Sequence, residues 1–324
     1  MDHSTADRLL FGIFLCSKSV DPLLALDRPQ WNRQIATASQ IEKRNELLQQ
    51  VLPYHDLLSE SIKGSDWELS LLEQPLLYIR LRPGREQQVL EALQRQSISY
   101  EAVAAHSLSL PATTSLNSWP GLNRDFVIQD LSSQRLASLL SLLPVSAQKK
   151  MWDCCAGSGG KSILAIDILA IGSLTVSDKR DTILRQLKQR FAQANIADYR
   201  SYELDLTSSL PASFTDTFSF IWADVPCSGS GTWSRTPEQL YFFEKSMLDH
   251  YCQLQQAILR QAVTRLQPGG YLLYSTCSAF AKENEEQVAW LEDQFGLHCV
   301  KQIMSNGAAE KADTLYAALL QKKD

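Results

Sequence analysis

Two cysteines follow two apolar segments in the C-terminal half of the chain. Cys227 comes directly after FSFIWADVP, and Cys277 comes directly after GGYLLYST. If these segments are the fourth and fifth strands of one parallel sheet, they are neighbours about 5 Å apart, and both thiols can face one cleft. Such a pair suits covalent catalysis, in which a thiolate bonds temporarily to the substrate. A lone cysteine is more often a small buried hydrophobic residue, which is our interpretation of Cys16, Cys252 and Cys299.

A glycine-rich turn lies between an apolar segment and a helical segment, in the sequence DCCAGSGGKS. Gly157, Gly159 and Gly160 let the backbone turn tightly and approach a ligand at the N-terminus of the next helix. The phosphate-binding pattern GxxxxGK[ST] would need glycine at Cys155, and the dinucleotide pattern GxGxxG would need glycine at Ser162. The turn therefore predicts a small-molecule site that is neither of these, with a purely structural turn as the alternative.

Acidic residues end the next two predicted strands. Asp178 ends SLTVSD, and Asp205 follows YEL. A carboxylate at the end of a strand in a doubly wound fold can accept hydrogen bonds from both hydroxyls of a ribose. Each aspartate alone is more commonly a helix cap. In series with the glycine turn, they favour S-adenosylmethionine as the ligand.

Methylation of carbon 5 of a cytosine is a reaction that needs a pair of thiols. The ring is too poor a nucleophile to take up a methyl group unaided, and thiolate addition at carbon 6 activates carbon 5. A second basic group then helps to remove the proton from carbon 5, so that the first cysteine can leave. Asp224, three residues before Cys227, is placed to act as an acid near ring nitrogen 3.

Three ordered segments resemble the signature motifs of a known family. DCCAGSGGK, ADVPCSGSGTWSRTPE and YSTCS followed by ENEE look like those of the Sun family (RsmB-like, NSUN-type) of RNA cytosine-5 methyltransferases, of the bacterial rRNA type. The resemblance covers residues 129–290. It implies a Rossmann-like domain that uses S-adenosylmethionine, with Cys277 as the nucleophile on carbon 6 and Cys227 as the residue that promotes product release.

The resemblance also implies contacts to the cofactor and to RNA. The cofactor contacts are Cys155, Ala156, Gly157, Ser158, Gly159, Gly160, Lys161, Asp178, Asp205 and Asp224. A small unit ahead of the catalytic domain resembles the RRM-like domain of the family. Its basic cluster of Arg80, Arg82 and Arg85 is predicted to bind RNA, with a solvated charged edge as the alternative.

Three regions must position these residues. Residues 1–65 have apolar positions spaced by three and four, as in NELLQQVL, which predicts a helical N-terminal region. Residues 66–120 contain PLLYIRLRP as a strand, REQQVLEALQRQ as a helix and YEAVAAHSLSL as another strand, which predicts a small α+β RRM-like RNA-binding domain. Residues 121–324 alternate strands with glycine turns and helices, so we expect an α/β, Rossmann-like parallel sheet that is doubly wound.

The composition limits the possible partners. The 324 residues are 44% hydrophobic and 21% charged with a net charge of -5, so any RNA must be held by a local patch rather than by bulk positive charge. Seven cysteines without a CxxC pair predict no metal site and a reducing cytoplasm. No stretch suits the roughly 20 apolar residues of a membrane span. We expect a cytoplasmic monomer without a membrane partner.

Three functions remain open at this point. The first is an S-adenosylmethionine-dependent RNA cytosine-5 methyltransferase that acts on ribosomal RNA, with the target base unpaired or flipped out of its stack. The second is a P-loop-like NTPase, which Cys155 argues against. The third is a non-catalytic RNA-binding module of the same fold, which the presence of both cysteines argues against. We favour the first.

Overall fold

The computed structural model describes residue 14 and residues 21–37, 54–63 and 67–323. The chain divides into two compact units, Met1–His55 and Asp56–Asp324. The first unit contains the helices α2 (Pro22–Asp27) and α3 (Pro29–Thr37). The segment NELLQQVL, on which the helical prediction for the N-terminal region rests, lies outside the described residues.

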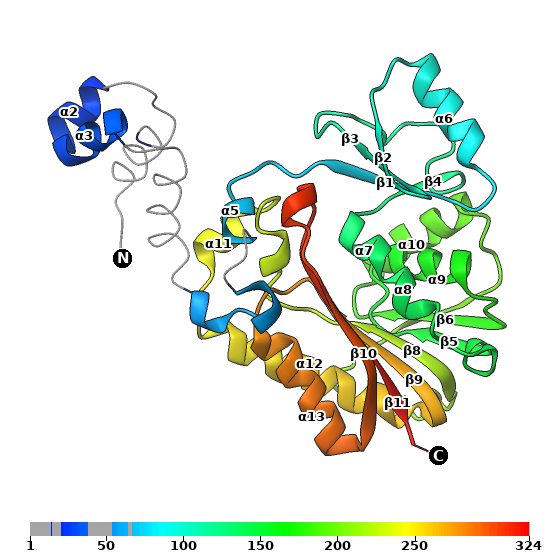
Figure 1. The fold of residues 1–324 in the computed structure, drawn as a ribbon. Coiled ribbons are helices and arrows are strands. Elements are labelled where there is room, and N and C mark those ends of the chain that lie inside the picture. Colours follow the sequence, from blue (N-terminus) through cyan, green and yellow to red (C-terminus); the bar gives the residue numbers. More distant parts are fainter. Residues whose placement is uncertain (1–13, 15–20, 38–53, 64–66, 324) are drawn as a thin grey trace. The chain divides into compact units, whose positions relative to one another are not determined.

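The second unit holds every residue predicted to do chemistry, and its elements follow one another along the chain as in Figure 1. Its α-helices are α5 (Trp67–Ser70), α6 (Glu86–Arg95), α7 (Leu131–Arg135), α8 (Ala137–Leu140), α9 (Gly160–Ile168), α10 (Asp181–Gln193), α11 (Pro237–Phe242), α12 (Met247–Thr264) and α13 (Glu285–Phe295). Its strands are β1 (Leu77–Leu81), β2 (Glu101–Ala104), β3 (Ser107–Leu110), β4 (Phe126–Ile128), β5 (Lys150–Asp153), β6 (Ser173–Asp178), β7 (Arg200–Glu203), β8 (Phe218–Asp224), β9 (Leu266–Thr276), β10 (Leu297–Ser305) and β11 (Leu315–Lys322). Its short 3-10 helices are η1 (His55–Leu57), which begins at the boundary, η2 (Glu60–Ile62), η3 (Val145–Gln148), η4 (Ser230–Thr232), η5 (Ala281–Glu283) and η6 (Ala308–Glu310).

The larger sheet has seven strands in the order β10-β11-β9-β8-β5-β6-β7. Its five strands from β5 to β9 pair in parallel, as the sequence predicted. At the other edge of the sheet β11 runs antiparallel to both β9 and β10, a detail that the sequence analysis did not address. A connection of about ten residues, too short for a helical crossover, joins β10 to β11 and allows the antiparallel pairing.

Helices cover both faces of this sheet (Figure 1). On one face α8, α9 and α10 pack against the strands through buried side chains such as Leu139, Ile163 and Leu187. On the other face α12 and α13 do so through Leu259 and Leu291. The arrangement is a three-layer α/β/α structure with a doubly wound sheet. The strand order reverses between β5 and β8, and this is the place where such sheets bind ligands.

The smaller sheet has four strands in the order β2-β3-β1-β4. The strand β3 lies antiparallel between β1 and β2, which is a split β-α-β arrangement. The segment predicted as one strand, YEAVAAHSLSL, is a hairpin of β2 and β3 that turns at Ala105 and His106. The fourth strand, β4, pairs with β1 although it lies beyond residue 120, where we placed the end of the small domain.

Candidate active site

The glycine turn joins β5 to α9 at the reversal point of the sheet. Gly159 has φ of +84°, and a Cβ atom there would lie 2.5 Å from Phe191 Cε1, so a side chain would collide with α10. Gly157 has φ of +52°, but a Cβ atom on it would meet nothing within 4 Å. Gly159 thus lets the turn pack against α10, while Gly157 leaves open space beside the backbone for a ligand.

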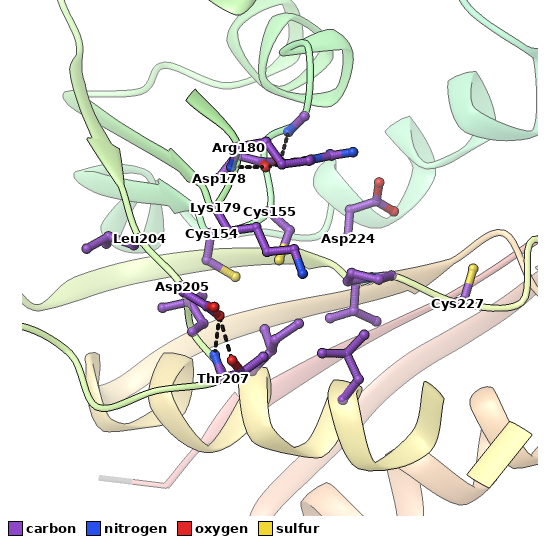
Figure 2. A pocket seen from close by; sticks show the side chains of 16 residues that line it. Cys154, Cys155, Asp178, Lys179, Arg180, Leu204, Asp205, Thr207, Asp224 and Cys227 are labelled. Carbon is purple, nitrogen blue, oxygen red and sulfur yellow. Dashed lines mark hydrogen bonds and ion pairs between the residues drawn. The ribbon is translucent and has the colours of Figure 1, made fainter. Parts of the chain in front are cut away.

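A cavity of about 400 Å³ opens at the carboxyl ends of these strands. Among the predicted residues, Cys155, Gly157, Asp178, Asp205 and Asp224 line it, and the thiol-bearing Cys227 lines it as well (Figure 2). The sequence alone did not identify the other residues that line the cavity. For several of them, the only signal in the sequence was a position next to a predicted strand end. These are Cys154, Lys179, Arg180, Leu204, Leu206, Thr207, Val225, Pro226, Leu254 and Ile258.

Asp178 is a buried carboxylate that ends β6. Its Oδ2 atom accepts a hydrogen bond of 3.1 Å from the Gly157 amide, which ties β6 to the glycine turn. The exposed Arg180 guanidinium also donates to both carboxylate oxygens, at 3.0 and 3.2 Å. Figure 2 shows this contact at the wall of the cavity. A ligand that donates hydrogen bonds to Asp178 must therefore compete with the Arg180 guanidinium.

Asp205 lies two residues beyond the end of β7 and also faces the cavity. Its Oδ1 atom accepts hydrogen bonds from the Thr207 amide at 2.9 Å and from the Thr207 hydroxyl at 2.7 Å. These bonds hold the pKa of Asp205 below its usual value, because they favour the ionised carboxylate. Its second oxygen stays available to a ligand in the cavity.

Five predicted cofactor contacts of the glycine turn do not line this cavity. Ala156 is buried and donates its amide to the Ser177 carbonyl, and Ser158 accepts from Arg190. Gly159 packs on α10, and Gly160 begins α9. Lys161 does not line the cavity itself but pairs with Asp224, which does, and the two belong to a cluster at the end of β8.

Lys161 and Asp224 form an ion pair that joins the cavity, which Asp224 lines, to the surroundings of Cys277. The Lys161 Nζ atom lies 2.6 Å from Asp224 Oδ2, and Ser275 donates to Asp224 Oδ1 at 2.7 Å. Burial acts to lower the pKa of Lys161, but the Asp224 carboxylate and the Cys277 thiol outweigh it and raise the pKa above the usual value. Lys161 is therefore a cation at neutral pH, with both a carboxylate and a thiol beside it.

The two predicted thiols lie beyond the ends of neighbouring strands. The strands β8 and β9 pair in parallel with Asp224 opposite Ser275, which confirms that they are adjacent. Burial raises the pKa of Cys277 to about 12, and the Lys161 ammonium opposes this rise. Burial, Glu283 and Cys277 raise the pKa of Cys227 well above its usual value. The thiols are thus close enough to influence each other, but only Cys277 has a cation beside it.

The predicted RNA-binding arginine cluster is corrected by the structure. Arg80 on β1 and Arg82, one residue beyond its end, both pair with Asp167 of α9, at 2.6 and 2.8 Å. Arg80 is only 6% exposed, so it has no surface to offer to RNA. Arg85 alone is half exposed, and it lies 3.7 Å from Asp125. The close spacing of three arginines in the sequence suggested a basic surface patch. In the extended chain, however, residues 80 and 82 lie on the same side, and both side chains point inward.

The described part of the chain offers neither a metal site nor a membrane-spanning helix. No group of three or more His, Cys, Asp or Glu side chains there could hold a metal ion. None of the described helices has the length and apolar character that a membrane crossing needs.

Solved structures share this fold. A methyltransferase homolog protein from Pyrococcus horikoshii superposes with a TM-score of 0.67 at 18% identity, covering 92% of this chain and 100% of that one. NSun6 from Pyrococcus horikoshii, solved with SFG, superposes with a TM-score of 0.71 at 14% identity, covering 85% of this chain and 97% of that one. These likenesses show the fold, a Rossmann-like doubly wound sheet whose strand order reverses beside the cavity.

The family model for the 16S rRNA methyltransferase RsmB/F matches residues 140–314, more than half of the chain. The chain belongs to the RsmB/F methyltransferase family, which confirms the resemblance drawn from its motifs.

Relatives of this family align with different shares of their length. Ribosomal RNA small subunit methyltransferase B of Xanthomonas campestris pv. campestris is 30% identical over 58% of this chain and 43% of its own length. The tRNA (cytosine(72)-C(5))-methyltransferase NSUN6 of Mus musculus is 33% identical over 50% of this chain and 36% of its own. The Proteus mirabilis methyltransferase B is 25% identical over 95% of this chain and 76% of its own. The chain thus spans less than half of the first two relatives.

Proposed function

We propose that this chain is an S-adenosylmethionine-dependent RNA cytosine-5 methyltransferase. The observation that carries the proposal is the pair of thiols at the ends of two adjacent parallel strands, with the Lys161–Asp224 ion pair beside one of them. Family membership supports RNA methylation, and of the curated relatives one is by name an rRNA methyltransferase and another a tRNA cytosine-C(5) methyltransferase.

The cavity fits S-adenosylmethionine in size and chemistry. Asp178 and Asp205 offer carboxylate oxygens to ribose hydroxyls, and the open side of Gly157 allows close approach of the ligand. Leu204, Val225 and Ile258 provide apolar contacts suited to an adenine ring. When bound, the cofactor supplies the methyl group. The fold neighbour solved with SFG, an analogue of S-adenosylmethionine, supports the assignment.

We assign the nucleophile to Cys277. Addition of its sulfur to carbon 6 of cytosine requires a thiolate, and the pKa of about 12 means that the thiol is protonated at neutral pH. Its proton must therefore leave as the base is engaged. The Lys161 ammonium, which lowers the pKa of Cys277, is the group that would stabilise the thiolate.

We assign supporting roles to Asp224 and Cys227. Asp224 is held by Ser275 and Lys161, and it would hydrogen-bond the cytosine near nitrogen 3 as charge develops on the ring. Cys227 lies beyond the end of the neighbouring strand and would assist removal of the carbon 5 proton, after which the bond between Cys277 and carbon 6 breaks. The loss of that proton and of the thiolate restores the aromatic ring.

We also propose a substrate, an oligomeric state and a cellular compartment for the enzyme. We propose ribosomal RNA as the substrate, presented with the target base out of its stack, because the matched family acts on 16S rRNA by name. We propose a monomer in the cytoplasm. The six described cysteines are all free thiols, which supports a reducing compartment.

Cysteine variants test the proposal and the two roles separately. The Cys277→Ala variant should form no covalent RNA adduct, because no nucleophile is present. The Cys227→Ala variant should attack and methylate once, then remain bonded to RNA. We expect a denaturant-resistant band that carries label from S-adenosylmethionine in the second variant only.

The other outcomes are equally informative. A band in Cys277→Ala and none in Cys227→Ala would reverse the two roles and keep the reaction. No transfer of label to RNA by the wild-type chain would remove the methyltransferase proposal and favour a non-catalytic RNA-binding module.

A further inference from the structure

A buried carboxylate connects the two loops that carry the thiols, and it is not among the residues that line the cofactor cavity. Glu283, at the end of η5, has no exposed surface. Its Oε1 atom accepts hydrogen bonds from the Ser228 amide at 2.9 Å and from the Gln255 side chain at 3.0 Å. Its Oε2 atom accepts from the hydroxyls of Ser228 and Ser278 at 2.5 and 2.6 Å. Four donors therefore surround one carboxylate, and no described cation pairs with it.

The positions of these donors link the two reactive loops. Ser228 directly follows Cys227, and Ser278 directly follows Cys277. One carboxylate thus holds the residue after each thiol, although the two thiols lie 50 positions apart in the chain. The Ser230 hydroxyl strengthens the link, since it accepts from the Ala279 amide at 2.8 Å.

Gln255 on α12 fixes the other side of the Cys227 loop. Its side-chain amide donates to the Pro226 carbonyl and to Glu283, each at 3.0 Å. These two acceptors set the orientation of the amide, because only its nitrogen can donate to them. Cys227 is thereby held through the residue before it and the residue after it.

Burial raises the pKa of Glu283, and the serine hydrogen bonds oppose that rise. A buried carboxylate without a cation costs folding free energy that an apolar side chain would not cost. The network is nevertheless complete, because each carboxylate oxygen has two donors. Fully satisfied buried polar networks specify one arrangement of the chain segments that they join.

We propose that Glu283 is a positioning residue that fixes the spacing of the Cys227 and Cys277 loops through Ser228 and Ser278. Its role in turnover rests on the proposed function, since that reaction needs both thiols at one base. Glu283 touches neither the cavity nor the thiols directly in this assignment. It acts through the backbone of the two loops.

Two substitutions separate this role from a general need for a buried side chain. Glu283→Gln keeps all four contacts, because its carbonyl can accept from the Ser228 amide and Gln255 while its amide donates to the two serine hydroxyls. Glu283→Ala removes them all. Glu286→Ala is the matched control, since Glu286 is an exposed glutamate three residues later.

The first measurement is the rate at which iodoacetamide alkylates each cysteine, followed by mass spectrometry of peptides, with Cys299 on β10 as the internal reference. Loosened loops expose their side chains more often, so Glu283→Ala should accelerate alkylation of Cys227 and Cys277 at least about fivefold relative to Cys299. Glu286→Ala should stay within about twofold of wild type at both thiols, and Glu283→Gln should do so at Cys277. At Cys227 both Glu283 variants also remove a carboxylate that raises the thiol pKa, so there Glu283→Ala is compared with Glu283→Gln and should still be alkylated faster. Unchanged relative rates in a folded Glu283→Ala protein, or equal acceleration in Glu283→Gln, would overturn the proposal.

The second measurement is single-turnover transfer of label from S-adenosylmethionine to RNA, with cofactor affinity measured by calorimetry. Glu283→Ala should slow transfer about tenfold or more, because misplaced reacting groups lose rate steeply, and it should leave cofactor affinity within about twofold. If Glu283→Ala does not fold, the double variant Ser228→Ala/Ser278→Ala releases the same loops from the other side and should give the same changes. A wild-type chain without methyl transfer would defeat the proposed function alone, because the alkylation rates still decide whether Glu283 holds the loops.

Discussion

The two thiols of the site have the same chemistry and different surroundings. Lys161 lowers the pKa of Cys277, whereas Glu283 raises the pKa of Cys227. A thiolate at Cys277 therefore gains a neighbouring cation, while a thiolate at Cys227 meets a carboxylate. This asymmetry, rather than the order of the residues in the chain, is the physical reason to expect attack by Cys277.

Asp153, the last residue of β5, should make stability depend on pH. It is fully buried, and burial raises its pKa to about 7, while Ser162 opposes the rise with a hydrogen bond of 2.6 Å. A carboxyl group whose pKa is raised by folding stabilises the protein at low pH, and that contribution is lost as pH rises toward the folded value. Between pH 5 and pH 8 the wild type should lose about 3 kcal/mol of unfolding free energy relative to Asp153→Asn.

Urea unfolding of both proteins at the two pH values measures this difference directly. The comparison removes the titration of all other groups, because both proteins share them. Parallel pH profiles for the wild type and Asp153→Asn would mean that Asp153 keeps an ordinary pKa in the folded chain.

The small sheet has two faces with different tasks. Ile79 and Leu81 of β1 point toward α6 and form the core of the small unit. Tyr78 and Arg80 alternate with them and point the other way, where the Tyr78 hydroxyl donates to the Glu310 carbonyl in η6 and Arg80 pairs with Asp167 on α9. The part of this face that β1 forms is therefore occupied by contacts with α9 and η6 and is not free to bind RNA.

Asp167→Ala should break this docking contact. The variant leaves the guanidinium groups of Arg80 and Arg82 without their shared partner, and side chains that are 7% and 13% exposed cannot turn to water easily. Loss of one partner from a buried ion pair costs about 3–5 kcal/mol. Glu91→Ala, which removes the exposed pair with Arg95 on α6, is the control and should cost no more than about 1 kcal/mol.

Urea unfolding of both variants gives the two costs. A small and equal loss in Asp167→Ala and Glu91→Ala would show that the arginines find other partners and that the junction does not depend on Asp167.

Local patterns in the sequence were sufficient for the elements that carry the chemistry. The glycine turn and the apolar segments before Cys227 and Cys277 each combine strand and turn signals within about ten residues, and the structure places them at adjacent strands. Contacts between distant segments have no such signal. Arg80 and Asp167 are 87 positions apart, and Ser228 and Glu283 are 55 positions apart. The sequence could predict that β1 has two faces, but not which element covers each one.

All of the candidate site belongs to the second compact unit. The cavity, both thiols and Glu283 lie within Asp56–Asp324, which has its own core around the larger sheet. A domain with its own core can fold alone. A protein of residues 56–324 should therefore bind S-adenosylmethionine with a Kd within about threefold of that of the full chain.

Calorimetry on the two proteins tests this expectation, with circular dichroism to establish that the shorter one is folded. A folded shorter protein with affinity weakened about tenfold or more would show that Met1–His55 contributes to the cofactor site.

The ion pair between Asp178 and Arg180 makes ligand binding at this wall an exchange. A ribose that takes the oxygens of Asp178 must replace a guanidinium that already donates to both of them. The ligand therefore gains only the surplus of its own hydrogen bonds over those that it displaces. Arg180 is 57% exposed and has room to turn away, so in the proposed complex the exchange would leave its guanidinium unpaired at the rim of the cavity. If the cofactor binds Asp178 as proposed, the charge of Arg180 would be balanced before binding and would become free at this wall only afterwards.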